Sequence, residues 1–196
     1  MLPDRYRNFE DLKAAERELV DYRVVAVDRG SAVTIIAPHG GHIEPPTSTI
    51  AAAVAADDFN FYAFEGLRVG RPHHELHITS HNFDEPRCCG LVEASDVVVA
   101  IHGRLDRDEP YCVYVGGLDH DLRDLAAQEL HTAGFDARIE NHMFPAFGRE
   151  NICNRGRHHK GTQLELPRGL RDDLSNNPTK MKAFVEALRR AIVATQ

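Results

Sequence analysis

The sequence predicts one α/β domain over residues 1–196, with a mostly parallel mixed sheet flanked by helices. Apolar, β-branched runs alternate along the chain with amphipathic segments, which favours parallel strands connected by helices. The run 97–101 is continuously apolar, as expected of a strand buried on both faces. A chain of 196 residues, 42% hydrophobic and 27% charged, is long enough for one sizeable core.

The elements follow from local patterns of side chains. Strands are expected at 22–27, 32–37, 60–64, 75–79, 97–101, 111–115, 135–139 and 162–166. Helices are expected at 8–19, 49–56, 119–132 and after Asn177-Pro178. Asp28-Arg29-Gly30 predicts a hairpin or a tight turn between the first two strands. Residues 141–161 have no apolar period and predict a long functional loop.

Composition excludes several classes of function. The formal net charge of −7 disfavours a dedicated nucleic-acid binder, so we expect no nucleic-acid partner. No apolar run approaches the roughly 20 residues of a membrane span, and we expect no membrane partner. The polar N-terminus predicts no signal peptide and a cytoplasmic site of synthesis. We also expect a monomer. The four cysteines predict reduced, mostly buried thiols, with a disulfide or a second metal site as the alternative.

The stretch from Ala37 to Pro45 is the most informative in the chain. It offers His39, His42 and Glu44 where an apolar strand ends, which is where ligands bind in open α/β sheets. Zinc favours imidazole nitrogen and carboxylate oxygen, and a catalytic zinc site uses three protein ligands plus water. Gly40 and Gly41 let the chain fold back so that His39 and Glu44 converge. A solvated or capped histidine is the competing interpretation.

A second strand end supplies the third candidate ligand. The run 97–101 leads directly into His102-Gly103. In a parallel sheet, His102 would lie at the same edge as His39, which completes a three-ligand set with Glu44. The alternative is a hydrogen-bonded histidine without a metal.

The last expected strand carries a candidate general base. Gln163 and Glu165 point to one face, and Leu164 and Leu166 point to the other. A buried glutamate beside a metal-bound water is suited to general-base catalysis. The alternative is a buried ion pair with Arg168 or Arg171.

The segment 149–171 has a local positive excess in an acidic chain. Within it, Asn154 and Arg155 form a planar donor pair suited to a carboxylate, with Arg157 close by. An acidic substrate is the natural inference, and a solvated basic loop is the alternative.

The sequence resembles the phage-type poly-γ-glutamate hydrolases, a zinc carboxypeptidase-like family. The matching segments are APHGGHIEPPTSTIA (37–51), FYAFEG (61–66), LHITSHNFDEP (76–86), VVAIHG (98–103), YVGG (114–117), GFDA (134–137), and NICNRG with TQLELPRGLR (151–171). They occur in the family's order and cover nearly the whole chain.

The resemblance implies a carboxypeptidase-like fold, zinc as cofactor, and a polyanionic poly-γ-glutamate substrate. It implies His39, Glu44 and His102 as metal ligands and Glu165 as the catalytic group. The Asn–Arg pair of carboxypeptidases, carried over to Asn154 and Arg155, implies a substrate carboxylate clamp.

Two departures from the family pattern are His42 and Pro46, where the family usually has glycine. Three ligands plus water already complete a zinc site, so we expect His42 either to contact one of the ligands without touching the metal or to be uninvolved. The pairs His73-His74 and His158-His159 are expected at the surface. Rival functions are a small-substrate amidohydrolase for N-acyl glutamate or cell-wall γ-glutamyl bonds, and a non-catalytic carboxylate-binding protein.

Overall fold

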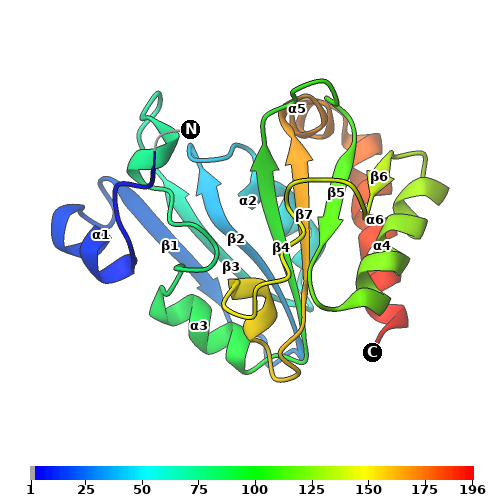
Figure 1. Cartoon of the computed structure of the whole chain (residues 1–196), viewed down its shortest axis with the longest axis horizontal. Coiled ribbons are helices and arrows are strands. Elements are labelled where there is room, and N and C mark those ends of the chain that lie inside the picture. The colour runs from blue at the N-terminus through cyan, green and yellow to red at the C-terminus, as the bar shows by residue number, and fades with distance from the viewer. Residues whose placement is uncertain (1–2) are drawn as a thin grey trace.

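The structure is a computed structural model that describes residues 3–196, and one seven-stranded sheet forms its centre (Figure 1). The strands are β1 (Tyr22–Val27), β2 (Val33–Gly41), β3 (Asn60–Gly66), β4 (Val97–Arg104), β5 (Val113–Gly116), β6 (Ala137–Arg138) and β7 (Thr162–Pro167). The α-helices are α1 (Phe9–Ala15), α2 (Thr47–Ala55), α3 (Pro86–Glu93), α4 (His120–Thr132), α5 (Arg168–Asn176) and α6 (Pro178–Ala194). Two short 3-10 helices are η1 (His73–Glu75) and η2 (Ile152–Arg155).

The strand order is β1-β3-β2-β4-β7-β5-β6. Pairing is parallel for β3–β2, β2–β4, β4–β7 and β5–β6, and antiparallel for β1–β3 and β7–β5. The predicted α/β fold with a mostly parallel mixed sheet is therefore confirmed. The hairpin alternative for the first two strands is wrong, because β3 lies between β1 and β2.

Helices cover the two faces of the sheet unequally. One face packs against α2, α4, α5 and α6 in a continuous apolar core that includes Ile101, Leu164 and Leu166. The other face carries a second core under α1, α3 and η2. Figure 1 shows α1 and α3 at one side of the sheet, and α4 and α6 at the other. On this second face, Val98 and Ala100 of β4 belong to the core, and the candidate site lies over His102 of β4 and Glu165 of β7.

Helix starts follow ordinary capping chemistry. The side chain of Asn8 accepts a hydrogen bond from the backbone N–H of Asp11 at 2.8 Å, and α1 begins there. Asn177 caps α6 in the same way, followed by proline in the first turn. The first helix ends at Ala15, four residues before the predicted end.

Two helices and one irregular segment differ from prediction. Helices α3 and α5 are short and each contains a glycine, so their apolar period does not stand out in the sequence. The predicted strand 75–79 is wrong: this segment follows η1 and pairs with no strand. The carboxylate of Asp4 accepts the backbone N–H of Thr79 at 2.7 Å, so a side chain satisfies a group that a neighbouring strand would otherwise bond.

No helix among residues 3–196 is both long enough and apolar enough to cross a membrane. All four cysteines are free thiols, and Cys88, Cys112 and Cys153 are buried, as predicted.

Candidate active site

A cavity of about 780 Å³ lies over the ends of β2, β4 and β7. The residues His39, Glu44, His102 and Glu165 all line it. Its other walls come from the segment 73–81, from the loop 143–148 and from the start of α5. The structure therefore brings the four predicted metal-binding and catalytic residues into one hollow.

An irregularity in β2 places His39. The register of β2 against β3 shifts between Ala37 and Gly40, and such bulges redirect side chains. Beyond it, Gly41 has a φ of +59°, and a Cβ there would lie 2.4 Å from the carbonyl oxygen of Gly66. Glycine is therefore required for the chain to pass this point. The backbone N–H of Glu44 then donates to the carbonyl of His39 at 2.9 Å, which folds the two residues together.

The nitrogen atoms of two buried histidines face each other at the centre of the site. His39 Nδ1 and His102 Nδ1 are 3.1 Å apart. Two ligands of one tetrahedral zinc, each about 2.05 Å from the ion, would lie roughly 3.3 Å apart. The donor set fits a zinc ion at this point.

Glu44 completes the convergence. Its Oε1 lies 3.4 Å from His39 Nδ1, and its Oε2 lies 3.9 Å from His102 Nδ1. The backbone N–H of Gly103 donates to Oε2 at 2.8 Å and fixes the carboxylate. Burial opposes ionisation of Glu44, but His39, His73 and His102 hold its pKa well below the ordinary value.

Outer hydrogen bonds orient the two histidines. His39 Nε2 lies 2.8 Å from the carbonyl of Ile78, so Nε2 donates this hydrogen bond and Nδ1 faces the centre of the site. His102 Nε2 lies 3.5 Å from Ser80 Oγ. Burial and then His39 lower the pKa of His102 to about 3, so its imidazole is neutral and able to bind a metal.

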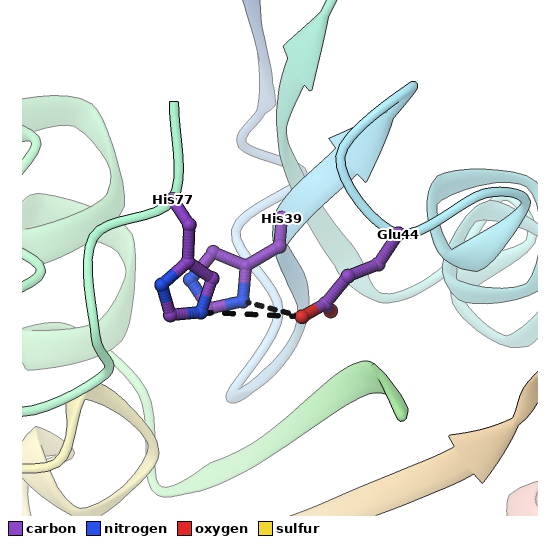
Figure 2. A group of neighbouring side chains, drawn as sticks. All are labelled: His39, Glu44 and His77. Carbon is purple, nitrogen blue, oxygen red and sulfur yellow. Dashed lines mark ion pairs between the residues drawn. The ribbon is translucent and has the colours of Figure 1, made fainter. Parts of the chain in front are cut away.

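His77 is a member of the site that sequence reasoning missed. His39, Glu44 and His77 offer ligand atoms within 4.8 Å of one another, and Figure 2 shows both rings facing the Glu44 carboxylate. His77 Nδ1 donates to Asp4 at 2.7 Å, a carboxylate–histidine pairing common around metal sites. Burial and then His39 lower the pKa of His77 to about 4. Only a contact between residues far apart in sequence reveals this histidine.

Glu165 lies beside the metal-binding groups on the neighbouring strand. Its Cα pairs with that of His102 in the β4–β7 register. Its Oε1 accepts from Gln163 Nε2 at 2.8 Å, and Gln163 in turn accepts from Asn151 at 3.0 Å. Burial and then the Glu44 charge raise the pKa of Glu165 well above its ordinary value. Among residues 3–196 it forms no ion pair with an arginine, so the ion-pair alternative is wrong.

The predicted carboxylate clamp lies elsewhere. Asn154 is fully buried, and its amide donates to the carbonyls of Ala146 and Gly148 at 2.8 and 2.9 Å. Arg155 donates to the carbonyls of Glu150, Phe83 and His81 and thereby ties two loops together. Arg157 is exposed and pairs with Asp96. None of Asn154, Arg155 and Arg157 lines the cavity, because backbone carbonyls and Asp96 engage their donors.

Other histidines divide between cavity and surface. His42 is exposed and does not line the cavity, which favours the interpretation that it is uninvolved. His73 and His74, expected at the surface, both line the cavity, and His73 Nε2 lies 3.2 Å from Glu44 Oε1. His158 is exposed, as expected.

Comparison with known proteins identifies the family. The family model described as poly-gamma-glutamate hydrolase matches residues 6–187. The chain belongs to the poly-gamma-glutamate hydrolase family. The prediction drawn from the sequence motifs is thereby confirmed.

Relatives and solved structures agree with this membership. The chain is 36% identical over 178 residues to the SPbeta prophage-derived protein YoqZ of Bacillus subtilis strain 168, covering 90% of this chain and 63% of YoqZ. It is 36% identical to YndL of the same strain, covering 87% of this chain and 67% of YndL. It thus spans about two thirds of the length of these relatives.

Two solved structures in the family superpose on nearly the whole chain. A bacteriophage poly-gamma-glutamate hydrolase matches with a TM-score of 0.91 and 29% identity, over 98% of both chains. The zinc-free apo form of YndL matches with a TM-score of 0.86 and 31% identity, also over 98% of both. N-formylglutamate amidohydrolase from Ralstonia eutropha JMP134, at 12% identity and a TM-score of 0.55, shares the fold. It covers 88% of this chain and 97% of its own.

Proposed function

We propose that the protein hydrolyses γ-glutamyl amide bonds of poly-γ-glutamate with zinc as cofactor. The observation that carries the proposal is the placement of Glu165 beside the convergent His39, Glu44 and His102 in one cavity. Family membership supports the reaction, and the zinc-free description of the YndL structure supports the metal.

The donor set of the site matches zinc. His39, Glu44 and His102 would hold the ion, which leaves room for water as the further ligand. His77 is a second candidate for contact with the ion, because its Nε2 lies 4.0 Å from Glu44 Oε1. When bound, zinc supplies a Lewis acid that polarises the amide carbonyl and acidifies water.

Glu165 performs the proton transfers in the proposed mechanism. As a carboxylate it accepts a proton from the attacking water, and it later gives that proton to the leaving α-amine. Its raised pKa makes the Glu165 carboxylate a stronger base than an ordinary glutamate. Gln163 and Asn151 hold the carboxylate in position through successive hydrogen bonds. Because these partners are all buried, they hold the carboxylate in a fixed position for proton transfer.

The test combines metal content with an assay of polymer length. We expect one zinc per chain by elemental analysis, and loss of that zinc in His39→Ala and His102→Ala. The matched control is His158→Ala, which changes an exposed histidine distant from the cavity and should keep the zinc.

Parent protein should shorten poly-γ-glutamate, lose this activity with a chelator and regain it with added zinc. N-acyl glutamates serve as rival substrates in the same assay. Full zinc retention in a variant that combines His39→Ala with His102→Ala would contradict the proposal. Turnover of N-acyl glutamate without turnover of poly-γ-glutamate would also contradict it.

A further inference from the structure

Four arginines form one side of the cavity, and we call them the arginine wall: Arg104, Arg107, Arg168 and Arg171. They come from the end of β4, the loop after it and the first turns of α5. The carboxylates that line the same cavity are Glu44 and Glu165. A cavity with more arginines than carboxylates, in a chain of net charge −7, is a local site for anions.

Arg171 is a buried guanidinium without a carboxylate partner. It is 5% exposed, and among residues 3–196 no carboxylate lies within ion-pair distance. Its donors instead reach the backbone carbonyls of Leu166, Arg104 and Pro45. These bonds fix its position, and the carboxylates of Glu44, Asp106 and Asp172 act on its charge only from beyond ion-pair distance.

A glycine in β4 allows Arg171 to sit against the metal-binding groups. A Cβ at Gly103 would lie 2.6 Å from the guanidinium carbon of Arg171 and 2.9 Å from Glu44 Cβ. Any side chain at this position would push the guanidinium away. The cation therefore occupies a place next to the predicted reaction centre.

Arg104 adds a second buried charge. Its terminal nitrogens donate to the carbonyls of Leu105, Asp106, Glu109 and Cys112, and its guanidinium stacks 3.9 Å above the Tyr114 ring. Its Nε has no partner within the described part of the chain. Burying charge without a counter-ion is costly unless a partner compensates it. Together, Arg104 and Arg171 favour an anion that arrives with the substrate.

The free donors match a carboxylate. A guanidinium has five N–H groups, and the three carbonyl contacts of Arg171 leave two of them. A planar guanidinium binds a carboxylate through paired donors, which a lysine ammonium cannot reproduce. At the rim, Arg107 is exposed and makes no hydrogen bond or ion pair with residues 3–196, so it is available to the same anion.

We propose that the arginine wall binds the free α-carboxylate beside the scissile γ-amide, with Arg171 as the donor and Arg107 as a rim cation. This inference rests on the proposed function. In a γ-linked glutamate chain, the leaving amine carries its α-carboxylate on the carbon bonded to the nitrogen. The charge therefore lies next to the bond that is cut, as Arg171 lies next to Glu44. The wall selects substrates by this charge.

The test compares two substrates in each variant: a short γ-glutamyl oligomer and its α-methyl ester. Parent protein should prefer the free acid in kcat/KM. Arg171→Lys should lower that preference at least about tenfold, because lysine lacks the paired donors that a guanidinium offers to a carboxylate. Any loss of folded or metal-loaded protein cancels in the ratio. An unchanged preference, or equal loss on both substrates, would overturn the proposal.

Two further variants keep the test decisive if Arg171→Lys folds poorly. Arg107→Ala removes an exposed cation of the wall and should lower the preference about threefold. Arg149→Ala removes an exposed cation outside the cavity and should leave the preference unchanged. Equal preferences in these two variants would overturn the role of the wall.

A binding measurement separates this inference from the proposed function. Calorimetric titration of the oligomer into Glu165→Gln reports binding without turnover. Binding that is lost in the ester, and weakened about threefold when Glu165→Gln is combined with Arg107→Ala, supports the wall even if the parent cuts no γ-glutamyl bond. Equal binding of acid and ester overturns the wall even if the parent is an active hydrolase.

Discussion

The two faces of β4 and β7 use the same strands for different purposes. On one face, Ile101, Leu164 and Leu166 are fully buried in an apolar core. On the other, His102 and Glu165 are also buried, at 2% and 6% exposed, yet they line a cavity. Alternation along a strand places each residue on the face opposite to its neighbours. The comparison shows that each site residue on these strands is held in position by the core residues directly before and after it.

The largest expected effect is on kcat, and it comes from a substitution on the polar face alone. Glu165→Gln should lower kcat on poly-γ-glutamate by about a hundredfold to ten-thousandfold, because the amide cannot accept the proton of water. Zinc content should be unchanged. The control is Glu65→Gln, a buried strand glutamate that pairs with Arg23 outside the cavity. Turnover of Glu165→Gln within about threefold of the parent would assign the base to another group.

The second prediction concerns a substitution on the apolar face, at the residue next to Glu165. Leu164→Ala should lower the free energy of unfolding by about 2–5 kcal/mol, because it leaves a cavity at a fully buried position. Urea denaturation measures the loss. At a temperature where the variant is folded, kcat should stay within about threefold of the parent. A kcat as low as that of Glu165→Gln would show that the two faces are not separable.

The smallest effect is the dependence of stability on pH in the metal-free protein. The pKa of Glu165 is raised on folding, so the folded state holds this proton more tightly than the unfolded state. The contribution of this proton to the free energy of unfolding is fully present below the pKa of the unfolded state, about 4.5. It is lost as pH rises through the higher pKa of the folded state. Glu165→Gln removes this loss.

Thermal unfolding with a chelator checks the sign. The variant and the parent should have similar midpoints near pH 4.5, and the variant should become the more stable one as pH increases. Parallel curves at every pH would contradict the raised pKa.

The sequence could predict the parts of the site that depend on strand periodicity. His39 and His102 end apolar runs, and Glu165 alternates with leucines, so their common edge follows from a parallel sheet. The order of the sheet was only partly accessible, because the turn after β1 gives no sign that β3 is inserted between β1 and β2.

Contacts that depend on loops could not be predicted from local patterns. His77 is oriented by Asp4, which is 73 positions away, and no periodicity connects them. Arg171 enters the cavity on α5, a short helix whose glycine obscured it in the sequence. Arg155 has the composition of a carboxylate clamp, yet its donors bind carbonyls of two loops. Residue type alone does not reveal which partner a side chain finds.

Asn154 supports the loop 143–148 through its hydrogen bonds to Ala146 and Gly148. That loop is one side of the cavity, whereas His39, His102 and Glu165 lie on strands. The loop wall of the cavity and the reacting groups therefore belong to separate parts of the chain. Substitutions at Asn154 or within residues 143–148 can change the shape of this wall while the reacting groups stay in place. Relatives that act on substrates of different length would then differ in this loop, and they would share the reacting residues on the strands.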